Sequence, residues 1–217
     1  FEEVRIYFII VIASAVFIFI NLWHFALYAP AEGIRHAFFQ VASIITTTGF
    51  ASANFDLWPE TSRTILVLLM FIGACAGSTG GGIKVSRFII AFKSFIKEII
   101  SYLHPRSVKK IKIEGKPLEH ETLRATNVYF MTYMVIFAVS VLLVSIENKD
   151  LVTNFAAVAA TFNNIGPGLS LVGPMANFGH FTDFTKYILM FDMLAGRLEI
   201  FPMMLLFCPA VWKRRRA

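Results

Sequence analysis

Long runs of apolar residues alternate along the chain with short polar stretches. The runs that reach about 20 residues or more, the length of a membrane-spanning helix, lie at residues 6–28, 65–103, 127–146 and 187–212. A helix rises about 1.5 Å per residue, so about 20 residues cross the roughly 30 Å hydrocarbon core of a bilayer. The second run is interrupted at residues 77–82, where four of the six residues are glycine. The pattern predicts four membrane-spanning helices, the second of them broken.

Two shorter apolar segments lie between these runs, at residues 33–45 and 150–162. Apolar segments of about 10–14 residues are too short to cross a bilayer and are typical of re-entrant elements. Each segment is followed by a polar tract that contains glycine, at residues 46–50 and 163–168. A helix that lies flat on the outer surface is the alternative interpretation of either segment alone. Because the same element occurs twice, two re-entrant helices are favoured.

The two halves of the chain are related by a shift of 117 residues, which places Gly49 on Gly166. The order of span, short helix, polar tract and span is the same in both halves, and both run in the same direction. Such a parallel repeat has its axis along the membrane normal. We therefore expect an all-α integral membrane protein with two parallel span–re-entrant pore helix–span repeats of a pseudo-fourfold, potassium-channel-like pore. The repeats occupy residues 1–104 and 123–217, and a cytoplasmic linker at 105–122 joins them.

Composition and charge agree with a membrane location. The 217 residues are 57% hydrophobic and only 16% charged, whereas soluble domains carry about 25% charged residues. The net charge is +6, and ten of the twenty Lys and Arg residues lie within 84–124, with four more at 213–216. Basic segments flanking membrane spans stay on the cytoplasmic side, so these parts, including the C-terminus, are expected there, close to membrane lipid. Basic residues placed in this way do not indicate a nucleic-acid partner.

The polar tracts can bind a cation through backbone oxygen atoms. In the first tract the candidates are Thr47, Thr48 and Gly49, and glycine permits the positive φ angles that a row of carbonyls facing one way requires. Rings of carbonyls replace the hydration shell of K⁺ in potassium channels. The carboxyl end of a re-entrant helix also carries partial negative charge, which favours a cation. Neither tract contains a carboxylate, which disfavours a Ca²⁺ site.

The glycine-rich interruption of the second run is a candidate gate. It consists of Gly77, Ser78, Thr79, Gly80, Gly81 and Gly82. Each glycine costs a helix about 1 kcal/mol relative to alanine, so an intramembrane loop is favoured over a tight helix-packing site. A phosphate-binding loop is not supported, because Ile83 precedes Lys84 where the motif needs the lysine directly after glycine.

One arginine lies midway along the last apolar run. The 117-residue shift places Gly80 on Arg197, whose charged neighbours in the sequence are Asp192 and Glu199. Charges within a membrane face the protein interior or water. Two interpretations stay open. Arg197 forms a structural ion pair with Glu199 or Asp192, or it meets the glycine-rich loop beneath the polar tracts as a fixed positive charge in the ion path.

Four motifs stand in a fixed order along almost the whole chain, at residues 46–50, 77–84, 163–168 and 195–202. Together they resemble the bacterial Trk/Ktr potassium-transporter family, part of the Trk/Ktr/HKT superfamily, and are most similar to its TrkH branch. The resemblance implies a pore-forming subunit of a K⁺ uptake system in the bacterial inner membrane. Such a subunit is expected to conduct K⁺ passively through a carbonyl-lined filter, with no organic cofactor and no enzymatic reaction.

The resemblance also implies which residues act and which partners are needed. The family's ion-binding positions fall on Thr47, Thr48, Gly49, Asn164, Ile165 and Gly166. The family builds one pore from four repeats, and this chain corresponds to the third and fourth. It therefore implies an N-terminal half with two further repeats, a homodimer of the full protein, and a cytosolic nucleotide-binding regulatory subunit of the TrkA type.

Other classes of protein make different demands on the sequence. A secondary transporter that couples K⁺ to Na⁺ or H⁺ is the alternative, and it would need an intramembrane carboxylate such as Asp192 or Glu199. A membrane hydrolase would need a nucleophile beside a base within the spans, and no convincing pair is present. A scaffold would have no use for two glycine-ended tracts.

Overall fold

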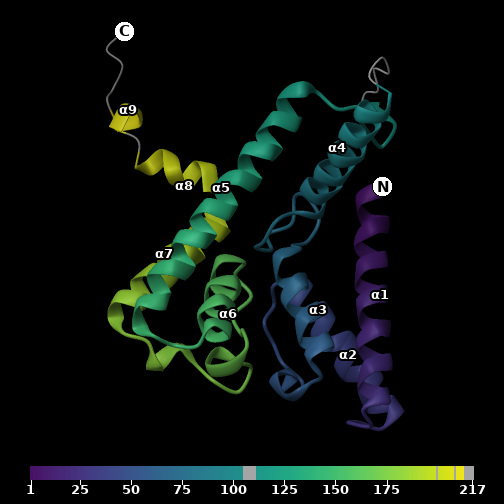
Figure 1. Ribbon diagram of the computed structural model, residues 1–217, viewed down its shortest axis with the longest axis vertical. Coiled ribbons are helices and arrows are strands. Elements are labelled where there is room, and N and C mark those ends of the chain that lie inside the picture. Colours follow the sequence, from purple (N-terminus) through teal and green to yellow (C-terminus); the bar gives the residue numbers. More distant parts are fainter. Residues whose placement is uncertain (105–110, 199, 208, 213–217) are drawn as a thin grey trace.

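The structure is a computed structural model that describes residues 1–104, 111–198, 200–207 and 209–212. The described chain is predominantly helical (Figure 1). Its helices are α1 (Glu2–His24), α2 (Pro30–Ile45), α3 (Glu60–Phe71), α4 (Val85–Leu103), α5 (His120–Val144), α6 (Leu151–Phe162), α7 (Asp183–Leu198), α8 (Ile200–Leu206) and α9 (Pro209–Trp212). Short 3₁₀ turns lie at Phe55–Leu57, Ser145–Glu147, Ser170–Val172 and Phe178–His180. The strands β1 (Lys112–Ile113) and β2 (Lys116–Pro117) form a small antiparallel hairpin.

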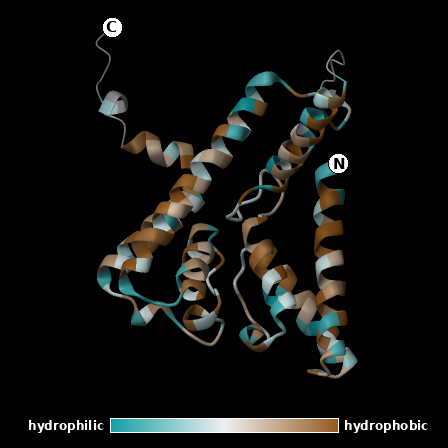
Figure 2. Ribbon diagram, in the orientation of Figure 1, coloured by the Kyte–Doolittle hydropathy of each residue, from teal (hydrophilic) through white to brown (hydrophobic). Residues whose placement is uncertain are grey.

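Two helices of the described chain, α1 and α5, are long and apolar enough to cross a membrane. Within an apolar stretch of 18 residues in α1, only 17% is buried within the chain, and within such a stretch in α5 only 28% is buried. Many large apolar side chains of both helices are exposed, and Figure 2 shows how much of both ribbons is hydrophobic. An exposed apolar surface of this extent marks contact with lipid or with another polypeptide.

The second predicted span is not a single helix. α3 ends at Phe71 and α4 begins at Val85, so the chain leaves helical geometry around the glycine-rich segment at 77–82. In the last predicted span, α7 and α8 lie on either side of Glu199, which is outside the described residues. α7 begins at Asp183, earlier than the apolar run, because an acidic residue in the first turn is favoured by the positive end of the helix dipole.

Part of the predicted linker at 105–122 carries regular structure. The β1–β2 hairpin and the first turn of α5 fall within it, while residues 105–110 lie outside the described residues. The basic residues at 213–216 also lie outside them. α5 thus begins slightly earlier than the predicted second repeat.

Each short helix packs between two neighbours from its own half of the chain. α2 contacts α1 and α3, and α6 contacts α5 and α7. The two halves meet where α3 contacts α6 and where α4 contacts α5 (Figure 1). Residues 156–160 of α6 are at most 1% exposed, and four of the five are alanine. Small side chains allow helices to approach closely, which places α6 in the centre of its half.

Aromatic side chains fix the contact between the halves. Phe71 on α3 lies with its ring centroid 5.4 Å from that of Phe137 on α5. Phe137 is in turn 5.2 Å from Phe155 on α6, and Tyr133 is 4.6 Å from Phe162. Edge-on and tilted ring pairs of this kind contribute about 0.5–1.5 kcal/mol each beyond their buried area. This cluster therefore holds the ends of α3 and α6 in place.

The first turn of α6 is capped by Asp150. Its carboxylate accepts hydrogen bonds from Thr153 N at 3.0 Å and from Thr153 Oγ1 at 2.5 Å. The side-chain hydrogen bond from Thr153 is the main cause of a lowered pKa of Asp150. A lowered carboxyl pKa means that the cap stabilises the fold above the unfolded-state pKa of about 4 and that this contribution is lost as the pH falls through the lower, folded-state value.

Replacing this cap should weaken the fold in a pH-dependent way. We expect Asp150→Ala to lower the free energy of unfolding by about 1 kcal/mol at neutral pH, measured by thermal unfolding in detergent. Asp150→Asn keeps an oxygen acceptor, so it should lose less stability at neutral pH and remove the dependence on acid. Equal stability of all three proteins at neutral pH would contradict a capping role.

Candidate functional site

The two polar tracts leave α2 and α6 along the same backbone path. Thr47 and Asn164 have φ angles of 55° and 56°, and Gly49 and Gly166 have φ angles of 79° and 105°. Positive φ is uncommon for residues other than glycine. Its recurrence at matching positions, 117 residues apart, shows that the sequence repeat is also a repeat of backbone conformation in these tracts.

The hydrogen bonds that end α2 and α6 repeat in the same way. Thr48 N donates to Ser43 O at 2.9 Å, and Ile165 N donates to Ala160 O at 2.8 Å. These bonds reach back five residues and close the last turn of each helix, as in the common C-terminal capping motif. Each tract therefore starts from a fixed position at a helix end.

The two tracts touch at Gly49. A β-carbon on Gly49 would lie 2.1 Å from the carbonyl oxygen of Ile165 and 3.3 Å from Pro167 Cδ. The backbone of the first tract thus lies directly against the second, and a side chain at this position would have to displace backbone. At Gly166, in contrast, a β-carbon would meet nothing within 4 Å.

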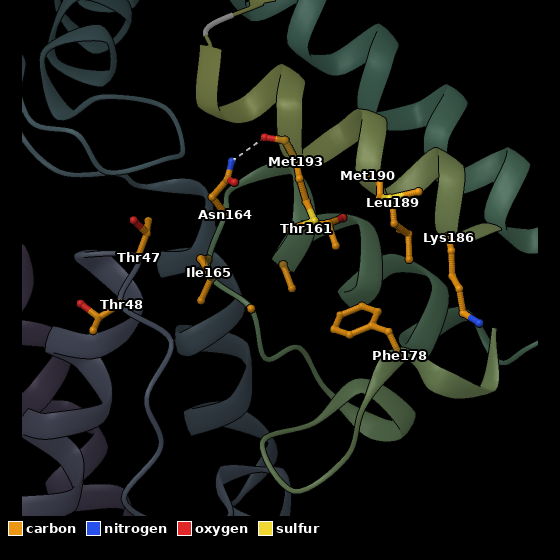
Figure 3. A pocket seen from close by; sticks show the side chains of 12 residues that line it. Thr47, Thr48, Thr161, Asn164, Ile165, Phe178, Lys186, Leu189, Met190 and Met193 are labelled. Carbon is orange, nitrogen blue, oxygen red and sulfur yellow. Dashed lines mark hydrogen bonds between the residues drawn. The ribbon is translucent and has the colours of Figure 1, made fainter. Parts of the chain in front are cut away.

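Residues of both tracts line a cavity of about 480 Å³ (Figure 3). Thr47 and Thr48 come from the first tract, and Asn164, Ile165 and Gly166 from the second. Side chains of α6, α7 and the turn at Phe178–His180 complete the wall. The part of the chain that the structure describes gathers no three His, Cys, Asp or Glu side chains that could hold a metal ion. The oxygen atoms of the two tracts are hydroxyl, amide and carbonyl groups, which suit a weakly held monovalent cation better than a divalent one.

The second tract is supported from behind by a buried tyrosine. Tyr133 on α5 donates from its hydroxyl group to Asn163 Oδ1 at 2.8 Å, and Asn163 Nδ2 donates to Ala159 O at 2.8 Å. Both side chains are buried. Tyr133 does not stand out in the sequence as a candidate, although a tyrosine within an apolar run signals a hydroxyl group that needs a partner.

Within the first tract, hydroxyl groups of residues close in the sequence contact each other. The second tract is contacted by helix α7. The hydroxyl groups of Thr46 and Thr48 lie 2.7 Å apart. Asn164 Nδ2 donates to Met193 O on α7 at 3.1 Å. A β-carbon on Gly196 of α7 would lie 1.8 Å from a carbonyl oxygen at the end of α6. Glycine at this position therefore lets α7 pack directly on the tract.

The glycine-rich loop lies against both tracts. Gly81 N donates to Thr47 Oγ1 at 3.2 Å, and a β-carbon on Gly81 would lie 2.2 Å from Asn163 O. The two ends of the loop are joined by the hydrogen bond from Gly73 N to Ile83 O, at 2.9 Å. The loop can approach the tracts this closely because glycine has no side chain.

Basic side chains hold the tip of the loop. Arg197 on α7 donates a hydrogen bond to Thr79 O. Lys84 Nζ donates to Ser78 O at 3.0 Å and to Gly80 O at 2.5 Å. These residues line a second pocket of about 200 Å³. The structure thus brings Arg197 and the loop together, while their role as a gate stays a prediction.

The structure does not pair Asp192 with Arg197. Asp192 is fully buried and accepts a hydrogen bond from Ser140 Oγ on α5, at 2.6 Å from its Oδ1. Its Oδ2 atom has no hydrogen-bond partner among the described residues. Five residues along a helix correspond to a rotation of about 140° after one full turn, so the two side chains leave α7 on different faces. Glu199, the other predicted partner of Arg197, lies outside the described residues.

Several known proteins have sequences similar to this one. The family described as TrkH, cation transport protein, matches residues 4–214. The chain is 40% identical over 193 residues to the Trk system potassium uptake protein TrkH of Escherichia coli K12, which covers 88% of the chain and 40% of that protein. It is 38% identical over 195 residues to TrkH of Halomonas elongata (90% and 40%). It is 32% identical over 211 residues to TrkG of Escherichia coli K12 (97% and 43%).

A solved structure has the same fold. The crystal structure of the potassium transporter TrkH from Vibrio parahaemolyticus matches with a TM-score of 0.89 and 37% sequence identity, over 97% of this chain and 45% of that one. The chain thus spans less than half the length of the relatives it matches. These relatives are named as potassium uptake proteins and not as enzymes. From the match over residues 4–214 and the shared fold, the chain belongs to the TrkH family of cation transport proteins.

Proposed function

We propose that this chain forms part of the ion pathway of a K⁺ uptake system. One observation carries the proposal: two glycine-containing tracts with the same left-handed backbone meet at Gly49 and Ile165, and residues of both line one cavity. The relatives supply the identity of the ion, because they are named as potassium uptake proteins. The transported species is then K⁺ itself, and no covalent step is required.

In this proposal α2 and α6 are re-entrant pore helices. They enter from the outer side and end at mid-membrane, while α1 and α5 cross the bilayer. Neither short helix has a basic residue in its last turn, so the partial negative charge at each carboxyl end is not neutralised there and favours a cation. Residues 1–104 and 123–217 are then the third and fourth repeats of a pseudo-fourfold pore.

The filter is proposed to consist of backbone carbonyls on the first and second tracts. Thr47, Thr48, Asn164 and Ile165 supply the oxygen atoms, and Gly49 and Gly166 provide the positive φ angles that the tracts require. Such carbonyls replace the water around a dehydrated K⁺. Two tracts surround only part of an ion, so the remaining oxygen atoms come from two further repeats in an N-terminal half.

The gate is proposed to consist of the loop at 77–82 and Arg197. The loop blocks the path below the tracts, and the guanidinium group adds a fixed positive charge. One unit charge about 8 Å from an ion costs roughly 2 kcal/mol at an effective dielectric constant of about 20. This barrier reduces conduction about thirtyfold without abolishing it.

Membership of the family also supports a proposal for the surroundings of the pore. We propose a multi-pass protein of the bacterial inner membrane with a cytoplasmic C-terminus, a homodimer of the full protein, and a cytosolic nucleotide-binding regulatory subunit of the TrkA type. The basic residues at 84–124 then face the cytoplasm and lie close to anionic lipid.

Electrophysiology of the complete transporter in planar bilayers tests this function. The current should reverse at the equilibrium potential of K⁺ and follow it when the K⁺ gradient is changed. A protein that carries no K⁺ current, or whose reversal potential follows Cl⁻, would contradict the proposal.

The second candidate is a transporter that couples K⁺ to H⁺ or Na⁺. The buried carboxylate of Asp192, with one oxygen atom lacking a hydrogen-bond partner among the described residues, favours it. The same recording separates the two functions. A reversal potential that also shifts with a pH or Na⁺ gradient would indicate coupling, and Asp192→Asn should then remove that shift.

A further inference from the structure

The side chain of Glu3 joins the two ends of the glycine-rich loop. Its Oε1 atom accepts one hydrogen bond from Ala76 N at 2.7 Å and another from Ser86 N at 3.0 Å. Ala76 lies just before the segment at 77–82, and Ser86 lies in the first turn of α4 just after it. A single half-buried carboxylate on α1 therefore spans the whole segment.

Both hydrogen bonds belong to the strong class. A charged acceptor roughly doubles the strength of a hydrogen bond relative to a neutral pair. Ser86 N is among the first N–H groups of α4, which have no partner within the helix, and the positive end of the helix dipole also favours a carboxylate there. The loop is thus held by α1 as well as by its own backbone bonds.

The neighbouring residue, Glu2, holds a different part of the chain. It forms an ion pair with Lys93 on α4 at 2.5 Å and accepts a hydrogen bond from Glu114 N at 3.4 Å. Lys93 also donates to Lys112 O at 2.8 Å. Glu114 lies in the turn of the β1–β2 hairpin, so one turn of α1 contacts the hairpin through Glu2 and the loop through Glu3. Figure 1 shows the start of α1 beside α4, which it contacts.

We propose that Glu2 and Glu3 form a link through which the β1–β2 hairpin sets the position of the glycine-rich loop. Glu3 holds the loop in its present conformation, and Glu2 passes a displacement of the hairpin to the same helical turn. α1 is a continuous helix that is packed on α2 and α3. A displacement of the hairpin therefore moves the first turn of α1 relative to the rest of the helix, which stays in place. The link rests on the proposed function of the loop as a gate. A displacement of the hairpin would weaken the contacts of Glu2 and then the two hydrogen bonds of Glu3, and it would so favour opening of the loop.

Hydrogen exchange in the complete transporter tests the two contacts directly. In Glu3→Ala, the amides of Ala76 and Ser86 should exchange about tenfold faster or more, the factor expected when a hydrogen bond to a charged group is lost. In Glu2→Ala, exchange should accelerate at Glu114 and, by a smaller factor, at the same two loop amides. Glu32→Ala, the same change at an exposed site on α2, is the matched control and should change neither. Unchanged exchange in the middle of α5 verifies that each variant is folded.

K⁺ flux supplies the functional readout. Glu3→Ala should raise basal flux by up to about tenfold, because the open population follows the same equilibrium as the loosened loop. Unchanged loop exchange in Glu3→Ala, faster exchange without a change in flux, or an effect of Glu2→Ala confined to the hairpin would each overturn the link. A failure of the proposed function is recognised separately, because the unmodified protein would then carry no K⁺ while the exchange data would still report on the contacts.

Discussion

Replacing Gly49 with alanine should reduce K⁺ uptake by about tenfold or more, the factor that corresponds to a free-energy cost of about 1.4 kcal/mol. The new β-carbon would lie 2.1 Å from Ile165 O, a distance at which backbone has to move. Gly49 also has a φ angle of 79°, and a left-handed conformation costs a non-glycine residue roughly 1–2 kcal/mol. The substitution therefore displaces both tracts at the point where they touch. Uptake is measured in cells that lack their own K⁺ transporters, with the amount of protein in the membrane as the reference.

A matched control separates the contact from the backbone strain. Gly115 in the β1–β2 hairpin has the same φ angle of 79°, but a β-carbon there would meet nothing within 4 Å. Gly115→Ala adds the same backbone strain without a clash, so it should keep its preference for K⁺ over Na⁺. If Gly49→Ala keeps the same preference for K⁺ over Na⁺ as Gly115→Ala, the two tracts do not form the filter.

Replacing Arg197 with alanine should raise K⁺ flux by up to about thirtyfold, the factor that corresponds to the roughly 2 kcal/mol of repulsion from one fixed charge. The same change removes the hydrogen bond to Thr79 O, so the tip of the loop also loses a contact. Both effects act in the same direction, towards a more conductive pore. Flux is measured by ⁸⁶Rb⁺ uptake into proteoliposomes that contain the complete transporter.

Two further variants show whether the lost charge or the lost hydrogen bond raises the flux. Arg197→Gln removes the charge and keeps a donor for Thr79 O, so it should conduct nearly as well as Arg197→Ala if repulsion dominates. Arg124→Ala makes the same change of net charge at an exposed position on α5 and should leave flux unaltered. Unchanged or lower flux in a folded Arg197→Ala protein would count against a gating role.

Much of the architecture follows from local sequence. The apolar runs predicted α1 and α5, and the apolar segments at 33–45 and 150–162 closely match α2 and α6. The glycines at 77–82 lie within the longer break between α3 and α4, and the shift that relates Gly49 to Gly166 matches the backbone repeat. These features depend on helix length, propensity and glycine φ angles, and each is a property of a few neighbouring residues.

Side-chain partners could not be predicted in the same way. Asp192 was considered a partner of Arg197, but the structure gives it Ser140, 52 residues away. The sequence alone does not single out Tyr133 and Glu3, because a hydroxyl group or a carboxylate has many possible partners until the helices are packed. Their actual partners lie 30 and 73 residues away along the chain.

The sequence by itself therefore determined that this chain is a repeat of apolar helices and glycine-containing tracts, because hydrophobic length and backbone freedom are encoded locally. Only the tertiary structure decided that Gly49 lies against Ile165 and that Arg197 reaches Thr79. Such contacts join residues more than 100 positions apart, and their distances are set by how α3, α6 and α7 pack. No local pattern contains that information, since packing depends on the shapes of all the surfaces that meet.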